Sequence, residues 1–307
     1  MNAMNTGLCA RAVAAAALIA LAALIALLGG CVSVGPENPG WTLSRSEIKA
    51  EKQRLRENPV ELERPVLVVT GYASVPPMAR MYAGAMEELT GADRDRFVAV
   101  DLPFINNLRD GVGVVLDKLN ERYPHPSEGE TIEVDVVGIS MGGIVAKLAA
   151  EPEEGRPRLN INTLYTLGAP HRGARMAHLN PIDQAAQDMV YKSIMLVKLH
   201  ENMPRRGYEL VPYGMLSDDL VGPKNSAPWG EDPIWVRGRI VGSHFAIQGD
   251  DRLQIDVARR LRGERQLLVP APLPGDEPRG AQRLEIPSGD GGATVTEDED
   301  LDERPSF

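Results

Sequence analysis

Apolar residues in the middle of the chain follow two patterns, which are short continuous runs and longer stretches with helical spacing. The continuous runs predict buried strands at residues 65–69, 97–100, 132–137, 161–167, 208–213 and 234–241. The helical spacing predicts helices at residues 78–89, 105–123, 141–150 and 251–262. Strands that alternate with helices and are apolar throughout are typical of an α/β fold, whose mostly parallel central sheet is flanked by helices on both faces.

This alternation is interrupted between residues 171 and 207, where apolar and polar residues are mixed at helical spacing. We expect one or two amphipathic helices here, inserted between two strands. They form either an ordinary helical layer on the sheet or a small helical cap over an active site. In a cap, Met189 and Ile194 are candidate pocket residues, because both side chains are apolar.

The N-terminus carries an uninterrupted apolar run at residues 12–28, which is near the lower limit of about 17 residues for a membrane-spanning helix. The run ends in Leu28, Gly29, Gly30 and Cys31, a sequence that resembles the lipobox of bacterial lipoproteins. The resemblance implies that residues 1–30 are a signal peptide and that Cys31 becomes a lipidated N-terminus, which carries diacylglycerol and an acyl chain such as palmitate. An uncleaved membrane anchor and a simple secretory cleavage are the alternatives.

Lipidation of Cys31 would hold the mature protein on a membrane of the bacterial cell envelope, because several acyl chains exceed what stable anchoring requires. Val32 follows the cysteine, and by analogy with enterobacterial lipoproteins the absence of aspartate there favours the outer membrane. Cys9 would leave with the signal peptide. The mature chain would then have no thiol for a disulfide, a metal site or nucleophilic chemistry.

The regions flanking the α/β pattern are polar. Residues 31–63 predict a Gly/Pro linker followed by a charged helix that begins after Ser44. Residues 264–307 contain 11 acidic and 4 basic side chains together with many prolines and glycines, which predicts a disordered acidic tail. The formal net charge of −10 argues against nucleic acid as a partner, and most of it belongs to this tail. The α/β domain is therefore expected at residues 64–263, with the cap at about 171–207.

Candidate chemistry is concentrated at Ser140, within the sequence Gly138-Ile139-Ser140-Met141-Gly142-Gly143. A predicted strand precedes this Gly-x-Ser-x-Gly motif, and a predicted helix with Lys147 on its polar face follows it. A tight strand-to-helix turn of this kind lifts a serine oxygen to the end of a sheet, and the glycines remove side chains that would collide. A phosphate-binding loop is disfavoured, because neither Gly-x-Gly-x-x-Gly nor a following Lys-Ser/Thr is present.

A nucleophilic serine needs a base to remove its proton and a third group to orient that base. In proteins with this motif the chain order is serine, acid and then histidine. Among five histidines only His244 follows a late acidic residue, and it comes directly after the last predicted strand. Asp218 and Asp219 are both candidates for the acid. Asp218 is favoured because an apolar residue, Val221, follows it at a spacing common in lipases.

Stabilisation of a negatively charged intermediate requires two N–H donors near the reacting carbonyl. The backbone N–H of Met141, directly after the serine, is expected to be the first. The second should come from the turn after the first strand, at Tyr72 or alternatively at Ala73. These groups would form an oxyanion hole.

From about residue 64 to 263 the chain resembles the α/β-hydrolases of the lipase and esterase type. The resemblance rests on the Ser140 motif, the sequence Leu167-Gly168-Ala169-Pro170-His171-Arg172-Gly173, Asp218 with Val221, and His244. It implies an α/β-hydrolase fold, the catalytic residues Ser140, Asp218 and His244, and a pocket or structural role for His171. Thr70-Gly71 stands where the family often has His-Gly, and Ile139 where lipases often have histidine.

These features predict a carboxylic ester hydrolase that acts on acyl or lipid esters and requires neither a cofactor nor a metal. An acyltransferase, phospholipase or thioesterase with the same three residues is the closest alternative. A catalytically silent hydrolase fold that serves as a binding lipoprotein is the alternative from another class. The sequence does not determine the oligomeric state or the length of the acyl chain.

Overall fold

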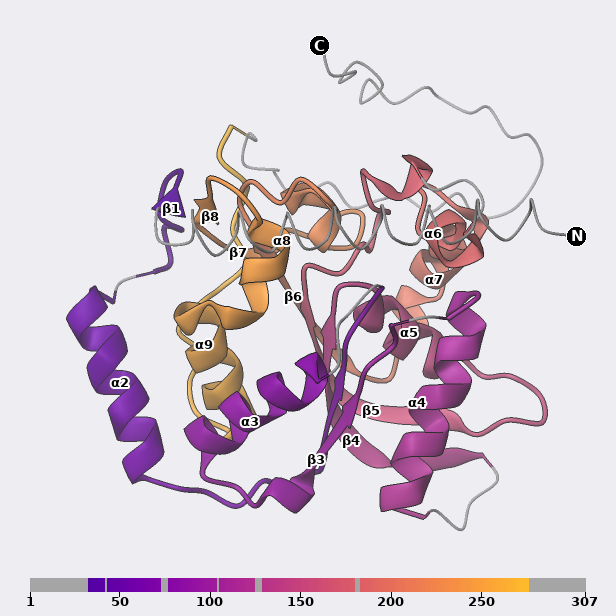
Figure 1. The fold of residues 1–307 in the computed structure, drawn as a ribbon, viewed down its shortest axis with the longest axis horizontal. Coiled ribbons are helices and arrows are strands. Elements are labelled where there is room, and N and C mark those ends of the chain that lie inside the picture. The colour runs from indigo at the N-terminus through magenta and orange to yellow at the C-terminus, as the bar shows by residue number, and fades with distance from the viewer. Residues whose placement is uncertain are drawn as a thin grey trace, which may run out of the picture. The chain divides into compact units, whose positions relative to one another are not determined.

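A parallel sheet of six strands forms the centre of the fold in the computed structural model (Figure 1). Its spatial order is β3-β2-β4-β5-β6-β7, and every neighbouring pair is parallel. The strands are β2 (Val66–Val69), β3 (Phe97–Val100), β4 (Glu130–Ile139), β5 (Arg158–Leu167), β6 (Glu209–Met215) and β7 (Ile234–Val236). The predicted α/β fold class with a mostly parallel sheet is therefore confirmed.

The structure describes residues 33–41, 43–72, 77–103, 105–124, 129–179 and 183–275. All of them belong to one compact unit. The predicted signal peptide, Cys31 and most of the predicted acidic tail lie outside the described residues. None of the described helices is long and apolar enough to span a membrane.

Helices cover the two faces of the sheet, and each face has its own apolar core. On one face α4 (Leu108–Arg122) and α5 (Met141–Ala149) pack in one cluster of buried side chains. On the other face α3 (Met78–Thr90) and α9 (Asp251–Leu261) pack in a second cluster. Alternate residues of β2 point to opposite faces, so that Leu67 and Val69 join the first cluster and Val66 and Val68 the second. Burial on both faces explains why the strands are continuously apolar.

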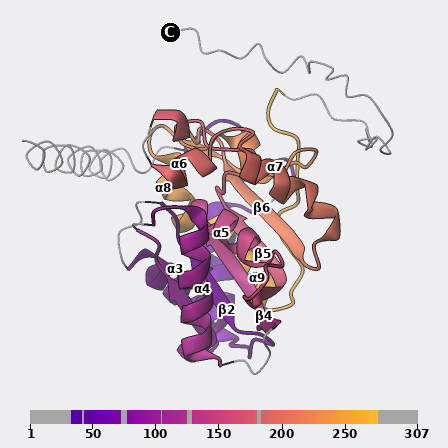
Figure 2. The ribbon, with the colours of Figure 1, turned by 90° about the vertical axis from the view of Figure 1, so that its right-hand side faces the viewer.

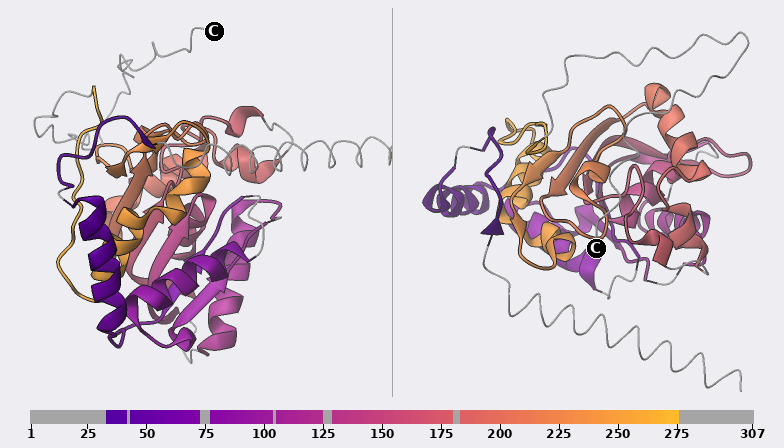
Figure 3. Two further views of the ribbon diagram at one scale, coloured as in Figure 1. Left: turned by 60° about the vertical axis from the view of Figure 1, so that its left-hand side comes forward. Right: turned by 90° about the horizontal axis from the view of Figure 1, so that it is seen from above.

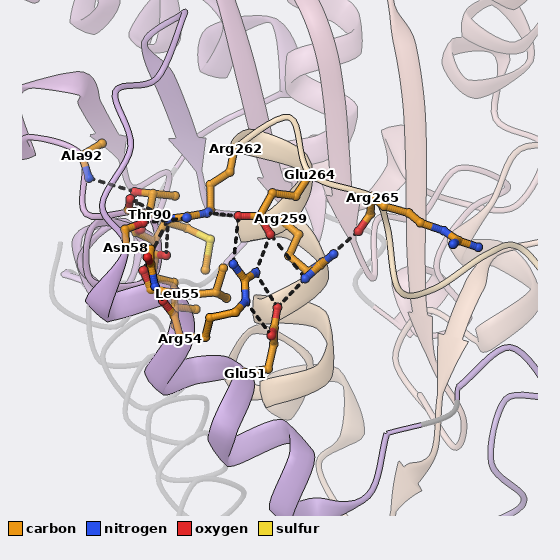
Figure 4. Close-up of polar contacts among 12 residues, drawn as sticks. Glu51, Arg54, Leu55, Asn58, Thr90, Ala92, Arg259, Arg262, Glu264 and Arg265 are labelled. Carbon is orange, nitrogen blue, oxygen red and sulfur yellow. Dashed lines mark hydrogen bonds and ion pairs between the residues drawn. The ribbon is translucent and has the colours of Figure 1, made fainter.

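The predicted charged helix is α2 (Arg45–Glu57), which begins with a capping box between Ser44 and Glu47. It is more than a solvated surface helix, because Leu55 is fully buried and the helix lies beside α9 (Figure 3). Ion pairs connect Glu51 and Arg54 of α2 to Arg259 of α9 and to Glu264 (Figure 4). The hydrogen bond from Arg54, together with Arg259, lowers the pKa of the Glu51 carboxyl to about 2.

Within the predicted Gly/Pro linker, residues 33–41 contact the domain. Strand β1 (Ser33–Val34) pairs antiparallel with β8 (Gly238–Arg239), the short strand that follows β7. Asn38 is buried, and its Nδ2 donates a hydrogen bond to the Trp235 carbonyl at 2.8 Å. Glycine and proline content indicates a linker, and the pairing with a distant strand binds these linker residues to the domain.

Two further boundaries differ from the prediction. The strand expected at residues 234–241 ends at Val236, and the chain changes sheets at Gly238, where an added Cβ would lie 1.9 Å from the Leu216 carbonyl oxygen. The tail expected from residue 264 onward instead packs on the domain through residue 273. Leu268 is fully buried, and Trp235 Nε1 donates to the Ala271 carbonyl at 3.0 Å. Both features depend on packing partners far away in the sequence.

One or two amphipathic helices were predicted between β5 and β6, and the described residues of this segment form several short helices. They are η2 (Ala177–Leu179), α6 (Gln184–Asp188), α7 (Ile194–Glu201) and η3 (Met203–Arg205). Figure 2 shows α6 and α7 at the same end of the molecule as α8 (Ser243–Ala246). This is the end at which the parallel strands finish, and an open α/β sheet binds its ligands there.

Candidate active site

Ser140 occupies a strained turn between β4 and α5. Its backbone has φ 54° and ψ −129°, a conformation that is costly for a residue with a side chain. The neighbouring glycines make the turn possible, because a Cβ on Gly138 would lie 2.4 Å from the Gly143 Cα and a Cβ on Gly142 would lie 2.2 Å from the Val69 carbonyl oxygen. The motif therefore forms the predicted strand-turn-helix, which presents the Ser140 hydroxyl at the end of the sheet.

His244 lies within hydrogen-bond distance of this hydroxyl. Its Nε2 is 2.9 Å from Ser140 Oγ, although 104 residues separate the two in the chain. The histidine belongs to α8, a single helical turn that follows Gly242 in the left-handed conformation. Ser243 secures the turn, because its hydroxyl accepts a hydrogen bond from the Arg239 N–H at 2.9 Å.

The carboxylate of Asp218 lies next to Nδ1, the other ring nitrogen of His244. Its Oδ2 lies 2.9 Å from His244 Nδ1, and the side chain is fully buried. The second oxygen, Oδ1, accepts hydrogen bonds from the N–H groups of Leu220 and Val221, both at 3.0 Å. Because the carboxylate accepts at Oδ2, Nδ1 carries the proton and Nε2 is left to accept from the Ser140 hydroxyl.

The conformation of the loop after β6 decides between the two candidates for the acid. Ser217 has a left-handed φ of 60°, which turns the chain sharply at the end of the strand. Asp218 then points inward to His244, whereas Asp219 is exposed. Adjacent residues in this loop point in different directions, so only Asp218 reaches the histidine.

The predicted oxyanion donors lie where the turn after β2 approaches the strained turn at Ser140. Met141 is the first residue of α5, so its N–H has no acceptor within the helix. Gly71 packs directly on it, since a Cβ there would lie 2.6 Å from the Met141 nitrogen. Tyr72 follows Gly71, and its hydroxyl donates to Asp183 Oδ2, at the start of α6, at 2.6 Å. Ala73, the alternative donor, lies outside the described residues.

Asp101 positions this turn and was not among the predicted residues. It follows β3, the strand beside β2, and its Oδ1 accepts from Thr70 Oγ1 at 2.8 Å and from the Ala79 N–H at 2.9 Å. The carboxylate therefore joins the turn after β2 to the first turn of α3. The signal in the sequence was an acidic residue directly after an apolar strand, at the sheet end that also carries Ser140.

The three predicted pocket residues occupy different environments. His171 is buried, with Nε2 2.9 Å from Thr166 Oγ1 and no hydrogen-bond partner for Nδ1 among the described residues. Met189 is buried in the core cluster on the α4–α5 face. Ile194, at the start of α7, is exposed. Their role in a substrate pocket stays a prediction.

A buried basic region lies on α5, about two helical turns after the serine. Lys147, predicted on the polar face of this helix, is almost completely buried, and burial together with the nearby Arg206 lowers its pKa to about 8. Burial also lowers the pKa of His171 well below its usual value, and the positive charges of Lys147 and Arg172 act in the same direction. No cluster of three or more histidine, cysteine or acidic side chains suited to a metal ion occurs within the described ranges.

Comparison with known proteins provides one family match. Residues 104–211, which include β4, Ser140 and α5, match the model of the PGAP1-like alpha/beta domain. A search of curated proteins found no significant match.

Several solved structures are similar to this chain. The mature form of the lipase BlEst2 from Bacillus licheniformis is 16% identical, with 69% of this chain and 95% of that chain covered and a TM-score of 0.45. Its propeptide form is 17% identical, with 68% of this chain covered and a TM-score of 0.45, and this chain spans only 52% of its length. Phospholipase PlaB from Legionella pneumophila is 12% identical, with 55% of this chain and 45% of that chain covered and a TM-score of 0.40.

The fold class follows from the topology and the family match together. The six parallel strands are flanked by helices on both faces, and the strand-turn-helix at Ser140 lies inside the segment that matches a known α/β domain. The described domain has the α/β-hydrolase fold.

Proposed function

We propose that this protein is a serine hydrolase that cleaves carboxylic esters through an acyl-enzyme. The continuous hydrogen-bonded series from Ser140 Oγ to His244 Nε2 and from His244 Nδ1 to Asp218 carries the proposal, with 2.9 Å at each step. A serine hydroxyl alone is a weak nucleophile, and this arrangement supplies the base and the group that orients it.

In the acylation step Ser140 Oγ attacks the carbonyl carbon of the ester, while its proton moves to His244 Nε2. The carbonyl electrons move to the oxygen, which accepts hydrogen bonds from the N–H groups of Met141 and Tyr72. The tetrahedral intermediate then collapses, the bond to the alcohol oxygen breaks, and His244 gives its proton to the leaving alcohol. Asp218 stabilises the imidazolium between these two transfers.

Deacylation repeats the same proton transfers with water in place of serine. His244 Nε2 takes a proton from water, the hydroxide oxygen attacks the acyl carbonyl, and Ser140 leaves as its hydroxyl after receiving that proton. The products are a carboxylic acid and free enzyme. If an alcohol replaces water in this step, the enzyme is an acyltransferase, and both outcomes use the same residues.

The proposed substrates are acyl or lipid esters of the bacterial cell envelope. This choice is supported by the lipobox-like sequence that ends in Cys31, which would tether the domain to a membrane, and by exposed apolar side chains near His244 such as Phe245. We propose the outer membrane as the location. Phospholipid, thioester and simple ester substrates share this chemistry.

Labelling with a fluorophosphonate probe and hydrolysis of p-nitrophenyl esters of graded chain length test this proposal. The wild type and Asp219→Asn, whose side chain is exposed, are expected to be labelled and active. Ser140→Ala is expected to lose both properties. A folded wild-type protein that neither reacts with the probe nor hydrolyses any ester would instead indicate a binding protein. Transfer only to added alcohols, with no acid released, would identify an acyltransferase.

A further inference from the structure

Exposed apolar side chains gather in the segments that leave the carboxyl ends of the strands around Ser140. Large hydrophobic side chains are normally exposed singly, and several within one functional region indicate a surface that contacts another apolar phase. We name this set the apolar rim. Its members are Tyr72 after β2, Met176 and Leu179 after β5, and Ile240, Val241 and Phe245 beside His244.

Three members of the apolar rim lie on the loop that carries the candidate base. Ile240 and Val241 come directly after β8, and Phe245 follows His244, with its ring edge-on to the imidazole at a centroid distance of 5.7 Å. In an ordinary surface loop these positions would be polar, because exposed aliphatic and aromatic side chains gain nothing in water. The loop therefore combines the chemistry of His244 with side chains that suit a lipid phase.

The N-terminal segment enters the domain at this same loop. Ser33 pairs with Arg239 and Val34 with Gly238, so β1 runs antiparallel to the strand that leads into Ile240 and His244 (Figure 1). Cys31 is two residues before Ser33, and two residues span at most about 7 Å. Whatever conformation those residues adopt, an anchor at Cys31 begins beside the loop. The same holds if the apolar run at residues 12–28 remains attached.

The charges near the loop are compatible with the surface of a membrane. Arg239, at the base of the loop, is partly exposed and forms no ion pair with any described residue, and a guanidinium suits a lipid phosphate. Arg237 forms an ion pair with Glu37, and Arg252 forms ion pairs with Glu37 and Asp250, so these two cations are balanced by two carboxylates. A cationic side chain beneath exposed apolar ones is typical of segments that lie at a bilayer interface.

We propose that the apolar rim is a membrane-binding surface, and that pairing between β1 and β8 holds the anchor so that the mouth of the active site faces the same bilayer. The proposal rests on the proposed function and on the predicted anchor. Ile240, Val241 and Phe245 enter the acyl region, and Arg239 contacts phosphate. An acyl ester from this bilayer then reaches Ser140 without crossing water, which favours membrane lipids over soluble esters as the substrate class.

The contact between the rim and lipid can be measured with the full-length protein, reconstituted into liposomes of phosphatidylethanolamine and phosphatidylglycerol. Val241→Cys is labelled with bimane, and Val114→Cys on α4 is the matched control, because the two valines are 40% and 39% exposed. The parent chain, without an introduced cysteine, gives the background label. We expect brominated phospholipids to quench the label at residue 241 at least about twofold and to leave the label at residue 114 almost unchanged.

The remaining outcomes each decide the proposal. Equal quenching at both positions, or none at either, overturns it. A blue-shifted label at residue 241 that brominated lipid does not quench means that protein covers the rim, for example the apolar run at residues 12–28, and also overturns it.

Circular dichroism and thermal unfolding of both labelled variants show whether they are folded. Turnover of a soluble short-chain ester is measured in the same samples. Turnover without quenching rejects the membrane-binding surface alone, whereas quenching without turnover in a folded protein rejects the proposed hydrolase alone.

Discussion

Two of the described histidines each lie 2.9 Å from a hydroxyl group, and only one of these two also has a carboxylate at its other ring nitrogen. His244 Nε2 meets Ser140 Oγ, and Nδ1 meets the carboxylate of Asp218. His171 Nε2 meets Thr166 Oγ1, but its Nδ1 has no hydrogen-bond partner among the described residues. A histidine next to a hydroxyl is therefore not sufficient, because the base also needs a group that fixes its tautomer and stabilises its charge.

The surroundings of the two histidines differ in charge and in access. His171 is almost completely buried and faces positive charges on Lys147, Arg172 and Arg206, which together with burial hold its pKa well below the usual value. It stays neutral and holds Thr166. His244 retains some exposure and faces a carboxylate, so it can accept a proton and then release it. The first environment keeps the histidine neutral, and the second suits proton transfer.

The largest expected effect comes from removing the reacting hydroxyl. Ser140→Ala should lower kcat/KM for a p-nitrophenyl ester by about 10⁵-fold or more, because the attacking atom is lost. Thr166→Val is the matched change at the other histidine, and it should leave turnover nearly unchanged. It should cost about 1–3 kcal/mol of stability, since His171 Nε2 loses its partner in the interior. Equal losses of turnover in Ser140→Ala and Thr166→Val would contradict the distinction between His244 and His171.

The second effect concerns the acid. Asp218→Asn should lower kcat by about 10⁴-fold, because an amide at this position favours the wrong histidine tautomer. Its exposed neighbour provides the control, and Asp219→Asn should keep wild-type turnover. Steady-state kinetics on one soluble ester, with thermal unfolding of each variant, would separate the two. Activity in Asp218→Asn close to that of the wild type would exclude its proposed role.

A third effect concerns the contact between Gly71, in the turn after β2, and Met141. In Gly71→Ala the added Cβ would lie 2.6 Å from the Met141 nitrogen, which is too close. The turn after β2 must therefore shift away from Met141. Loss of one oxyanion donor lowers the rate by about 100-fold to 1000-fold. Gly84→Ala in α3 is the control, because nothing lies within 4 Å of its added Cβ. Gly84→Ala should leave kcat unchanged. A wild-type kcat in Gly71→Ala would show that the turn after β2 is not displaced.

The smallest effect is one of pH on stability, and it concerns the buried basic region. Lys147 has a folded pKa of about 8 against 10.5 when unfolded, so between these values the unfolded state binds more protons. The free energy of unfolding should therefore rise with pH across this window, by about 3 kcal/mol relative to Lys147→Met. Urea unfolding of both proteins from pH 7 to 11 gives this difference. A constant difference would mean that Lys147 titrates as an exposed lysine does.

Local patterns predicted the strands and helices well, because burial on both faces of a parallel sheet leaves continuous apolar runs. The strand at residues 97–100 and the start of the helix at Met141 match the structure. The strained turn at Ser140 was also predictable, since the required glycines are close neighbours of the serine in sequence. The role of Asp101 was not apparent, because its partners Thr70 and Ala79 belong to other elements.

The sequence by itself determined the fold class, the position of the strained serine, and the order of serine, acid and histidine along the chain. These depend on periodicity and on neighbouring residues, which a single sequence records directly. Only the tertiary structure decided between Asp218 and Asp219, placed Lys147 in the interior, and attached residues 33–41 and 264–273 to the domain. Each of these depends on a contact between residues far apart in the chain, and such a contact leaves no local pattern.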